Sequence, residues 1–530
     1  MSSVSVPYVT AKLVPAASVV SLSLPRALIV GTLPIAMNAA FGAATSKLMT
    51  ISPKSSYEAV GDKELAGVFG TGSLYHMIRY AQKGADRNYP IDVLLIKNSQ
   101  TGGAKTTITL AAAAAAKGTI TVDVFNGYEF SAAVNFEAGA TVDSIAAAIV
   151  AQLNTGVNKP FSVASSAGVI TITWVDGFVS PATPIHVITN DSGLTPVVAH
   201  VGNTTPTQPA ADVFDILGDV RYTSIVLQDS YFQSIAFANN YLLDRFNAFN
   251  TIADGVVYCA LTDSFTNLLV KTQTLQGQPI SLWVDRKIDG LFGASIGSNA
   301  KISPDLKMAF VATAIDRYRV EGADLTDIVS SAVGLLDYRG DIALASLPYH
   351  NIAIPAAKPS DARWYFDHKD QKTLNANGLS TWGVNRAGVT EITGDARTMW
   401  KVDAAGNTNK TWSPLEHLWT ASVIREYLFQ KLKIYFGKMR LTDGELIAGR
   451  SMTNEASIKE ELIAWYVELG DNALVVKSDD YIKRFADNCT VSVEAENQLV
   501  IITGVYPILT HAGEIDYTIQ TVTNYGQAAV

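Results

Sequence analysis

Short apolar runs alternate with helical periods through the middle of the chain. The apolar runs occupy residues 224–228, 255–261 and 280–284, and the helical periods occupy residues 230–250, 267–276 and 303–319. Short uninterrupted apolar runs are typical of parallel strands that are buried on both faces. This rhythm predicts a mostly parallel sheet with helices on its faces.

A related outline precedes it, with a strand at 26–31, a turn and helix at 69–84, and a strand at 91–97. The turn Gly70-Thr71-Gly72 invites comparison with a nucleotide-binding loop. The third glycine of a dinucleotide fingerprint would fall at Tyr75, and no lysine follows the turn as a phosphate loop requires. We therefore interpret the turn as a structural one that starts a helix.

The composition changes abruptly between residues 100 and 209, where threonine, glycine and a run of six alanines are concentrated. Alternating patterns at 118–125 and 128–136 flank Asn126-Gly127, which is a strong hairpin signal. A helix is expected at 141–153, and further strands are expected at 161–164, 169–174 and 185–188. The region predicts a small, self-contained, β-rich inserted domain.

The most legible helix spans residues 413–436. Ser413 is placed to cap it, Pro414 suits its first turn, and Glu416 lies three residues after the cap, which together predict a capping box. Its apolar positions cover more than one stripe, so we expect burial on several sides, and we assign the buried face to the helix's own domain. A second amphipathic helix follows at 453–469, and strands are expected at 490–495, 499–506 and 515–522.

Both ends of the chain have an extended, β-forming pattern. The N-terminal pattern comprises Val4, Val6, Tyr8 and Val9, and the C-terminal one comprises Ile515, Tyr517, Ile519 and Thr521. Apolar terminal segments of this kind pair with sheet edges, either in their own subunit, which is the more common case, or in another.

The composition excludes several classes of function. The 530 residues are 48% hydrophobic and 17% charged, with a net charge of −9 and no dense run of Lys and Arg, so we expect no nucleic-acid binding. Cys259 and Cys489 are the two cysteines, which leaves no disulfide framework or thiolate metal site. Asp337, Asp341, His350 and His368 lack metal-ligand spacing, so we expect neither a metal nor a cofactor. We find no secretion signal and no membrane span, and we expect folding in the cytoplasm.

Three stretches in this order of elements resemble the tail sheath proteins of contractile-tailed bacteriophages, of the type with a β-rich insertion. They are FGTGSLYHMIRYA at 69–81, LGDVRYTSIVLQDS at 217–230 with the helix ending LLDRF, and LNANGLSTWGVNRAGVTEITGDART at 374–398. The last is the most specific, because sheath proteins place a short helix, a hairpin and a Gly-x-Arg-Thr-like turn before a long helix. The N-terminal VSVPYVTAK departs from the Pro-Gly-Val-Tyr-like arm of many sheaths.

The pattern and the resemblance together imply a multidomain, mixed α/β fold with five parts. These are an N-terminal arm (1–24), a middle α/β domain (25–99 and 210–365), an inserted outward-facing β-rich domain (100–209), a C-terminal inner domain (366–514) and a C-terminal strand (515–530). In the family both termini add strands to sheets of neighbouring subunits, which replaces the own-subunit expectation for the N-terminal arm.

The resemblance implies a structural subunit of the virion tail, assembled in the host cytoplasm, with no catalysis. It polymerises with itself as stacked hexameric rings around a tail tube and contracts from a metastable extended state, and its other partners are the baseplate and tail terminator proteins. The tube-facing surface is expected on the C-terminal domain, at the cations Arg425, Lys431, Lys433, Lys438 and Arg440. A solvated helix face explains these charges equally well.

Three other interpretations remain open. The chain could belong to a phage-derived contractile injection system or bacteriocin, to a doubly wound α/β enzyme, or to the surface adhesins. The enzyme would need a convergent polar site, and no Ser-His-Asp, His-Glu-x-x-His or complete phosphate-loop pattern is present. An adhesin usually needs an export signal.

Overall fold

The computed structural model describes most of the chain between residues 26 and 509. The described ranges are 26–51, 62–86, 91–100, 102–190, 193–206, 208–218, 220–246, 255–275, 278–291, 293–321, 349, 352–354, 362–402, 406–408, 412–442, 444–494 and 499–509. The predicted arm strands at both termini lie outside these residues, as do Asp337, Asp341 and His350.

The centre of the molecule is an eight-stranded sheet in the order β16-β15-β13-β12-β11-β1-β3-β2. Its strands are β1 (Ala27–Thr32), β2 (Ser46–Ile51), β3 (Ile91–Ile96), β11 (Ser224–Leu227), β12 (Val256–Asp263), β13 (Ile280–Arg286), β15 (Leu379–Val384) and β16 (Thr390–Thr393). Neighbouring strands are parallel except at the two edges, where β2 and β16 are antiparallel to their partners. The predicted mixed α/β fold with a mostly parallel sheet is confirmed.

Helices cover both faces of this sheet, and the strands are buried on both sides as a result. Along β1, Ala27 and Ile29 face one hydrophobic cluster, whereas Leu28 and Val30 face another, because successive side chains of a strand point in opposite directions. The first face carries α3 (Ser73–Gly84) and α7 (Pro304–Glu321), which pack on each other. The second carries η4 (Ala211–Leu217), η5 (Asp229–Ser234), α5 (Ile235–Phe246) and α6 (Phe265–Lys271).

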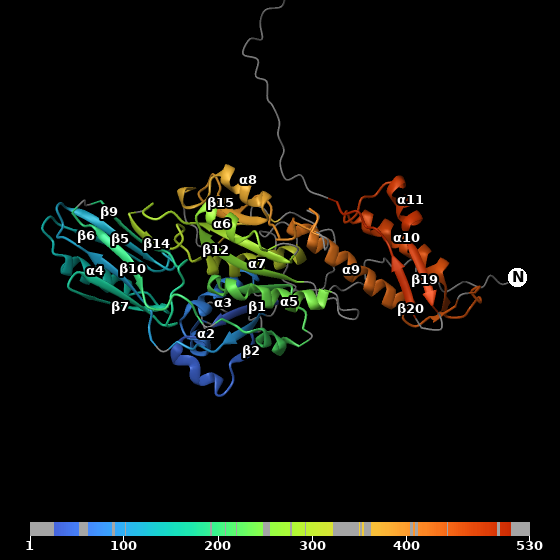
Figure 1. The fold of residues 1–530 in the computed structure, drawn as a ribbon, viewed down its shortest axis with the longest axis horizontal. Coiled ribbons are helices and arrows are strands. Elements are labelled where there is room, and N and C mark those ends of the chain that lie inside the picture. The colour runs from blue at the N-terminus through green and yellow to red at the C-terminus, as the bar shows by residue number, and fades with distance from the viewer. Residues whose placement is uncertain are drawn as a thin grey trace, which may run out of the picture.

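The inserted region forms two four-stranded antiparallel sheets and one helix, at one end of the molecule (Figure 1). The sheets contain β4 (Lys105–Leu110), β5 (Gly118–Val124), β6 (Ser131–Phe136), β7 (Phe161–Ser166), β8 (Val169–Trp174), β9 (Ile185–Thr189) and β10 (Pro196–Val201), and the helix is α4 (Val142–Leu153). The fourth strand of the second sheet is β14 (Ala294–Ile296), which comes from the main fold.

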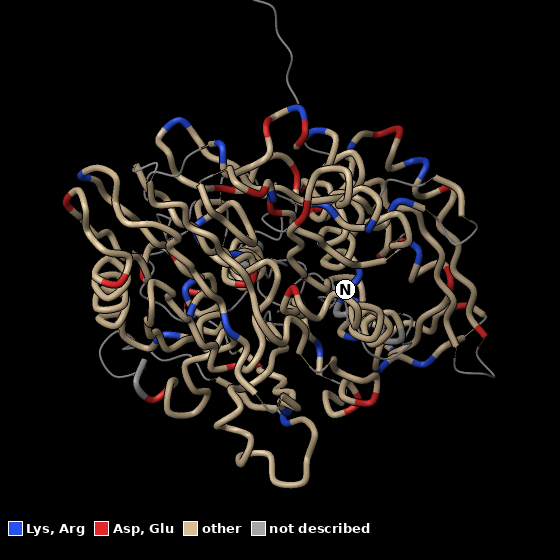
Figure 2. The backbone as a smooth tube through the Cα atoms, turned by 60° about the vertical axis from the view of Figure 1, so that its left-hand side comes forward, with Lys and Arg blue, Asp and Glu red and all other residues tan. Residues whose placement is uncertain are grey.

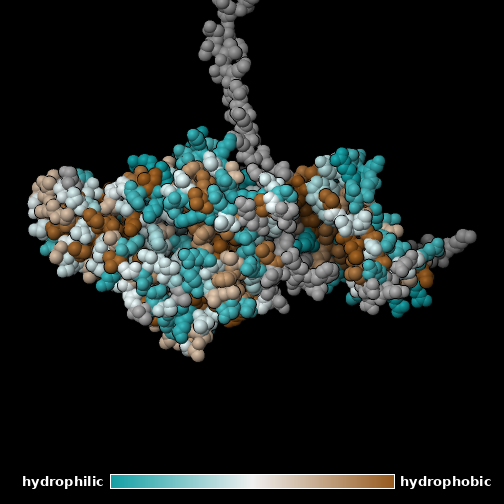
Figure 3. Space-filling model, in the orientation of Figure 1, coloured by the Kyte–Doolittle hydropathy of each residue, from teal (hydrophilic) through white to brown (hydrophobic). Residues whose placement is uncertain are grey.

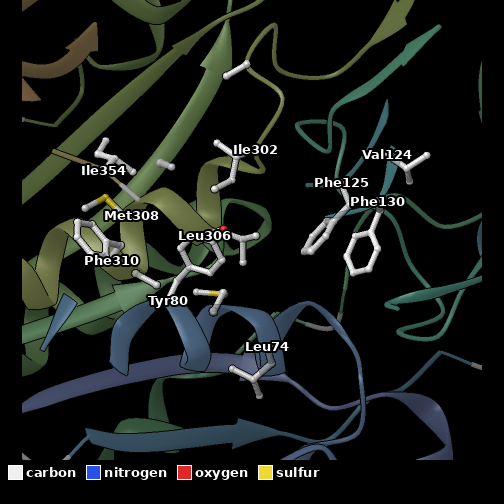
Figure 4. Close-up of a cluster of buried hydrophobic side chains, with 14 of the residues drawn as sticks. Leu74, Tyr80, Val124, Phe125, Phe130, Ile302, Leu306, Met308, Phe310 and Ile354 are labelled. Carbon is white, nitrogen blue, oxygen red and sulfur yellow. The ribbon is translucent and has the colours of Figure 1, made fainter. Parts of the chain in front are cut away.

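The insertion is therefore not self-contained, contrary to the sequence-based expectation. Its core is continuous with that of the main sheet, and Figure 4 shows Phe125 and Phe130 of the insertion beside Ile302 and Leu306 of the α7 region. Aromatic contacts also join the insertion to the main fold, since the His76 ring on α3 lies edge-on to Phe125 at 5.3 Å and to Phe130 at 5.6 Å.

The hairpin predicted at Asn126-Gly127 differs from the structure. β5 and β6 do pair, but their last partners are Asp123 and Ser131, so a wider loop replaces the two-residue turn. Asn126 is buried there, forms a β-bridge with Ile302 and donates a hydrogen bond from Nδ2 to the Tyr80 hydroxyl at 3.0 Å. Contacts with the main fold override the local turn signal.

The long C-terminal helix α9 (Leu415–Phe436) begins two residues later than predicted, and the predicted capping box is absent. Pro414 forms a β-bridge with Arg397, and the Ser413 carbonyl accepts a hydrogen bond from the Thr398 N–H at 2.7 Å. The N-cap position therefore falls on Pro414, which has no side-chain acceptor, and the Ser413 side chain does not cap the helix. Glu416 lies in the first turn but is buried at 4% exposure.

α9 connects two bodies instead of packing wholly within one. Leu415, Leu418 and Trp419 belong to the core of the main sheet, whereas Val423, Ile424 and Tyr427 belong to a separate C-terminal cluster. At 1.5 Å per residue its 22 residues span about 33 Å, and Figure 1 shows it crossing between the bodies. This corrects the assignment of its buried face to one domain.

The boundary predicted at residue 366 is also wrong. η8 (Ala362–Trp364) ends just before it, and the residues after it form α8 (His368–Ala376), β15 and β16. The two strands belong to the eight-stranded sheet. β15 is recruited because it pairs in parallel with β13 at Leu282, Trp283 and Val284. The C-terminal body therefore begins within α9.

The C-terminal body is small and packs around α10. It contains β17 (Arg440–Leu441), β18 (Met452–Thr453), α10 (Glu455–Asp471), α11 (Asp479–Asn488), β19 (Thr490–Glu494) and β20 (Leu499–Thr503). Asn454 caps α10 by accepting from the Ser457 N–H at 3.0 Å, and the Ser457 hydroxyl accepts from the Asn454 N–H at 3.1 Å. The sequence pattern did not predict α2 (Asp62–Phe69), η2 (Ile35–Phe41) or α11.

Candidate interaction surface

The C-terminal body ends in a two-stranded antiparallel sheet of β19 and β20. Two strands alone are marginal in water, so such a sheet requires support from packing or from further strands. On the outer side of β19, the Val493 N–H donates to Glu455 Oε1 at 3.0 Å. On the outer side of β20, no strand of the described chain pairs with it.

The alternation of the ladder identifies which groups of β20 point outward. Val493 pairs with Val500, and its N–H points away from β20 toward Glu455. In an antiparallel ladder the N–H groups point toward the partner strand in one pair and away from it in the next. By this alternation Val500 and Ile502 direct their N–H groups to the open edge. That edge can accept an added extended segment.

An aromatic stack holds this sheet on the helices. The rings of Tyr466 on α10 and Phe485 on α11 stack at 4.4 Å, and Tyr506 after β20 lies 5.0 Å from Phe485. The Tyr466 hydroxyl donates to the Val476 carbonyl at 2.7 Å. The open edge of β20 therefore belongs to a sheet that is packed on α10 and α11.

Exposed apolar side chains gather on this body and along α9. They include Ile501 on β20 at 47% exposure and Val505 at 67%, and the others are Phe429, Ile434, Tyr435, Leu446, Ile447 and Leu509. Figure 3 shows hydrophobic surface on the C-terminal body and where α9 reaches it. Exposed apolar side chains that gather on one part of a protein are typical of a site of association.

The predicted basic cluster is divided by the structure. Lys431 is buried, with 5% of its side chain exposed, and its Nζ lies 3.1 Å from Glu468 Oε2 on α10. The same ammonium group lies over the rings of Tyr427 at 5.1 Å and Tyr435 at 5.8 Å. Lys431 therefore joins two helices within the subunit.

The other four cations are arranged differently. Lys433, Lys438 and Arg440 are exposed around the C-terminal end of α9, and Arg425 is half-buried. Figure 2 shows Lys and Arg interspersed with Asp and Glu over the described chain. Whether any of these residues contacts a partner stays a prediction, and so does the pairing of the terminal arm residues.

The glycine turn before α3 places an acidic side chain where a phosphate would bind. Asp176 from the insertion accepts from the Ser73 N–H and from the Ser73 hydroxyl, both at 2.8 Å. A Cβ on Gly72 would lie 1.9 Å from Asp176 Oδ1, so only glycine leaves room for this carboxylate. The sequence could not reveal this cap, because its two halves lie 103 residues apart.

A cleft of about 960 Å³ lies between α8 and the β15–β16 hairpin. Its polar groups already serve the fold: Asp367 caps α8 through the Asp370 N–H at 2.8 Å, Arg286 donates to the Arg363 and Tyr365 carbonyls, and Arg397 pairs with Asp395. Within the described ranges, no cluster of three or more His, Cys, Asp or Glu is arranged to hold a metal. No described helix combines the length and apolarity needed to span a bilayer.

Comparison with known proteins gives likenesses to solved structures. No family model matches the chain, and no curated protein matches it. Among solved structures, the chain is similar to the crystal structure of a sheath tail protein from Listeria innocua, with 11% identity over 93% of this chain and 94% of that one and a TM-score of 0.43.

Proposed function

We propose that this chain is the structural subunit of a contractile tail sheath. The three sequence stretches that resemble that family fall on coherent parts of the fold. The first covers the turn and most of α3, the second covers β11 and the start of η5, and the third covers the end of α8 with β15 and β16, shortly before α9. The resemblance therefore extends over the main sheet as far as the α9 connection.

The observation that carries the proposal is the two-stranded sheet with an open edge at the far end of α9. An arm from a neighbouring copy would add a strand beside β20, with its valine, tyrosine or isoleucine side chains against Ile501 and its surroundings. The arms are the segments that contain Val4, Val6, Tyr8 and Val9, and Ile515, Tyr517, Ile519 and Thr521.

The energetics favour exchange of more than one arm. A strand with about five main-chain hydrogen bonds, each worth about 0.5 to 1.5 kcal/mol net, contributes on the order of 5 kcal/mol. The loss of translational and rotational freedom on association costs about 4 to 15 kcal/mol, so one arm barely offsets it. Two arms per subunit and the multivalency of a lattice make the polymer stable.

In this proposal the C-terminal bodies form the knitted inner layer, and α9 connects each to its main sheet body. The subunits form stacked rings around a tail tube, end at the baseplate and the terminator, and shorten by rigid-body rotation of the sheet bodies. The work comes from burial of surface between subunits, without catalysis, cofactor, nucleic acid or membrane insertion. The assembled location is the virion tail.

For the tube contact we propose Lys433, Lys438 and Arg440, which are exposed at one end of α9. Arg425 is a lesser candidate, because it is half-buried. Lys431 is engaged with Glu468 and acts by holding α9 on α10.

Two other functional assignments compete with that of a phage tail sheath. A phage-derived injection device or bacteriocin would use the same subunit chemistry, and the structure of one subunit favours neither. A doubly wound enzyme would bind its ligand at the carboxyl ends of the parallel strands. At the start of α3 that position holds Asp176 of the chain itself.

The direct test is deletion of residues 1–24 from the otherwise complete chain, followed by sedimentation velocity beside the full-length protein. We expect the full-length protein to sediment as polymers and the deleted protein as single subunits with unchanged circular dichroism. Polymers of equal size from both proteins would contradict the role proposed for the N-terminal arm.

A further inference from the structure

A cluster of three buried carboxyl groups lies where the insertion meets the main sheet. Asp176 comes from the loop between β8 and β9, Asp229 follows β11, and Asp305 lies in the first turn of α7. Asp176 is 3% exposed and Asp305 is 5% exposed. A cavity of about 20 Å³, lined by Asp176 and Asp305, separates the loop from the sheet.

Hydrogen bonds tie each carboxyl group across this junction. Asp176 accepts from Ser73 on α3, and the Ser73 hydroxyl in turn accepts from Gln228 Nε2 at 2.9 Å. The Ser180 hydroxyl, from the same loop as Asp176, donates to Asp229 Oδ2. The Asp229 N–H donates to Asp305 Oδ1 at 2.6 Å, which places the two residues side by side.

The charges of the cluster do not balance if all three groups are ionised. The described residues that line the cavity include no Lys, Arg or His. The N-terminal ends of α3 and α7 together supply roughly one positive charge, against three negative ones. In addition, Asp176 Oδ1 and Asp229 Oδ1 are buried without a hydrogen-bond partner. A buried carboxylate without compensation takes up a proton.

We propose that Asp176, Asp229 and Asp305 form a proton-operated latch that fixes the loop between β8 and β9 on the main sheet. In the closed state at least one proton is held by the neighbouring pair Asp229 and Asp305. When that proton passes to solvent, the two adjacent carboxylates repel each other. The hydrogen bond from Ser180 to Asp229 is then lost, and the loop is no longer held in position. This proposal is independent of the sheath assignment.

The surroundings of the cluster agree with proton uptake. Burial raises the pKa of Asp176 to about 6, and it also raises the pKa of Asp229. Burial, followed by the charge of Asp229, raises the pKa of Asp305. The other titratable groups that face the cluster are Tyr231 and the Cys259 thiol, and burial raises the pKa of both, so they stay neutral near pH 7. Neither can supply a compensating positive charge.

The raised pKa values of the three carboxyl groups determine how the stability of the closed state changes with pH. A carboxyl group whose pKa is raised by folding stabilises the closed state at low pH, and that stability is lost as the pH rises through the raised pKa. The latch should therefore open on the alkaline side. Each pH unit above that pKa favours opening by up to about tenfold.

The test is amide hydrogen exchange of the full-length protein between pH 6 and pH 9, read as protection factors for residues 174–184. We expect protection in wild type to fall with rising pH. Asp305→Asn keeps an oxygen acceptor for the Asp229 N–H without a titratable proton, so its protection should stay level. Asp263→Asn is the matched control, because Asp263 on β12 is paired with Lys271 at 2.6 Å and lies outside the cluster. It should behave as wild type does.

A second readout does not depend on the variant's folding. Infrared difference spectra of wild type should show loss of a protonated carboxyl band over the same pH range. Level protection in wild type, or an equal fall in Asp305→Asn, would overturn the proposal. So would restored protection of wild type at pH 9 on addition of Ca²⁺, which would make the cluster a metal site.

Discussion

A single buried ammonium group joins α9 to the rest of the C-terminal body. Lys431 pairs with Glu468 and lies over two tyrosine rings, whereas Lys433, two residues later, is exposed. Neighbouring lysines on one helix therefore have different roles. A sequence pattern shows the positive charges but not which one is turned inward.

The pair Lys431→Glu and Lys433→Glu separates these roles. Lys431→Glu places a carboxylate against Glu468 in a buried site, and we expect it to lower the free energy of unfolding by about 3 kcal/mol or more. Lys433→Glu should change that free energy by less than about 0.5 kcal/mol. Urea denaturation of both variants measures this, and equal midpoints would contradict the structural role of Lys431.

Glu416 makes the root of α9 sensitive to pH. Burial, strengthened by the nearby charge of Asp395, raises the pKa of this carboxyl group to about 7. The proton-bound form is therefore favoured by folding, and the stability that it contributes is present below the ordinary glutamate pKa of about 4.3 and lost as the pH rises through about 7.

Glu416→Gln should remove the pH dependence of stability that Glu416 causes, because glutamine does not titrate. At pH 8 we expect the variant to be more stable than wild type by up to about 3 kcal/mol, with a smaller difference at pH 5. Thermal denaturation at the two pH values measures the slope. Glu445→Gln, at an exposed position, is the control and should leave the slope unchanged. A wild-type slope in Glu416→Gln would show that Glu416 does not titrate in this range.

At the scale of elements, the open edge of β20 can be blocked without altering its pairing with β19. Ile502→Pro removes an outward N–H and places a ring on the edge, whereas Ile502→Ala loses comparable packing but keeps the N–H. We expect Ile502→Pro to abolish polymers and Ile502→Ala to retain them. Pelleting by ultracentrifugation compares the two. Polymers from both variants would place the added strand elsewhere.

Elements whose order and period lie within a short stretch were predictable from sequence. The predicted strand at 169–174 agrees with β8 to the residue, and Thr141 caps α4 through the Ser144 N–H as its position suggests. Residues that serve a distant segment were not predictable. Asp176 caps α3, and the bridge from Arg397 displaces Ser413 from its cap, because in each case the partner is fixed by tertiary packing.

The same limit applies to the candidate surface. The sequence predicted strands at 490–495 and 499–506, which the structure shows as β19 and β20, but not that Glu455 meets one edge and leaves the other open. The boundary of the C-terminal body was misplaced because β15 has its own hydrophobic pattern, and only pairing with β13 assigns it to the main sheet.

At the scale of the whole molecule, one helix joins two bodies. Leu415, Leu418 and Trp419 anchor α9 in one of the two cores of the main sheet body, and Val423, Ile424 and Tyr427 anchor it in the core of the C-terminal body. This arrangement suits a subunit in which the C-terminal body stays linked to neighbouring subunits while the main sheet body rotates. An open sheet edge beside exposed apolar side chains favours association with another chain.

The measurement that tests the central claim most directly is negative-stain electron microscopy of the purified full-length protein over a range of salt and protein concentrations. The sheath assignment predicts hollow tubular polymers with regular cross-striations, formed without a tube protein. Dispersed single subunits under every condition would contradict it.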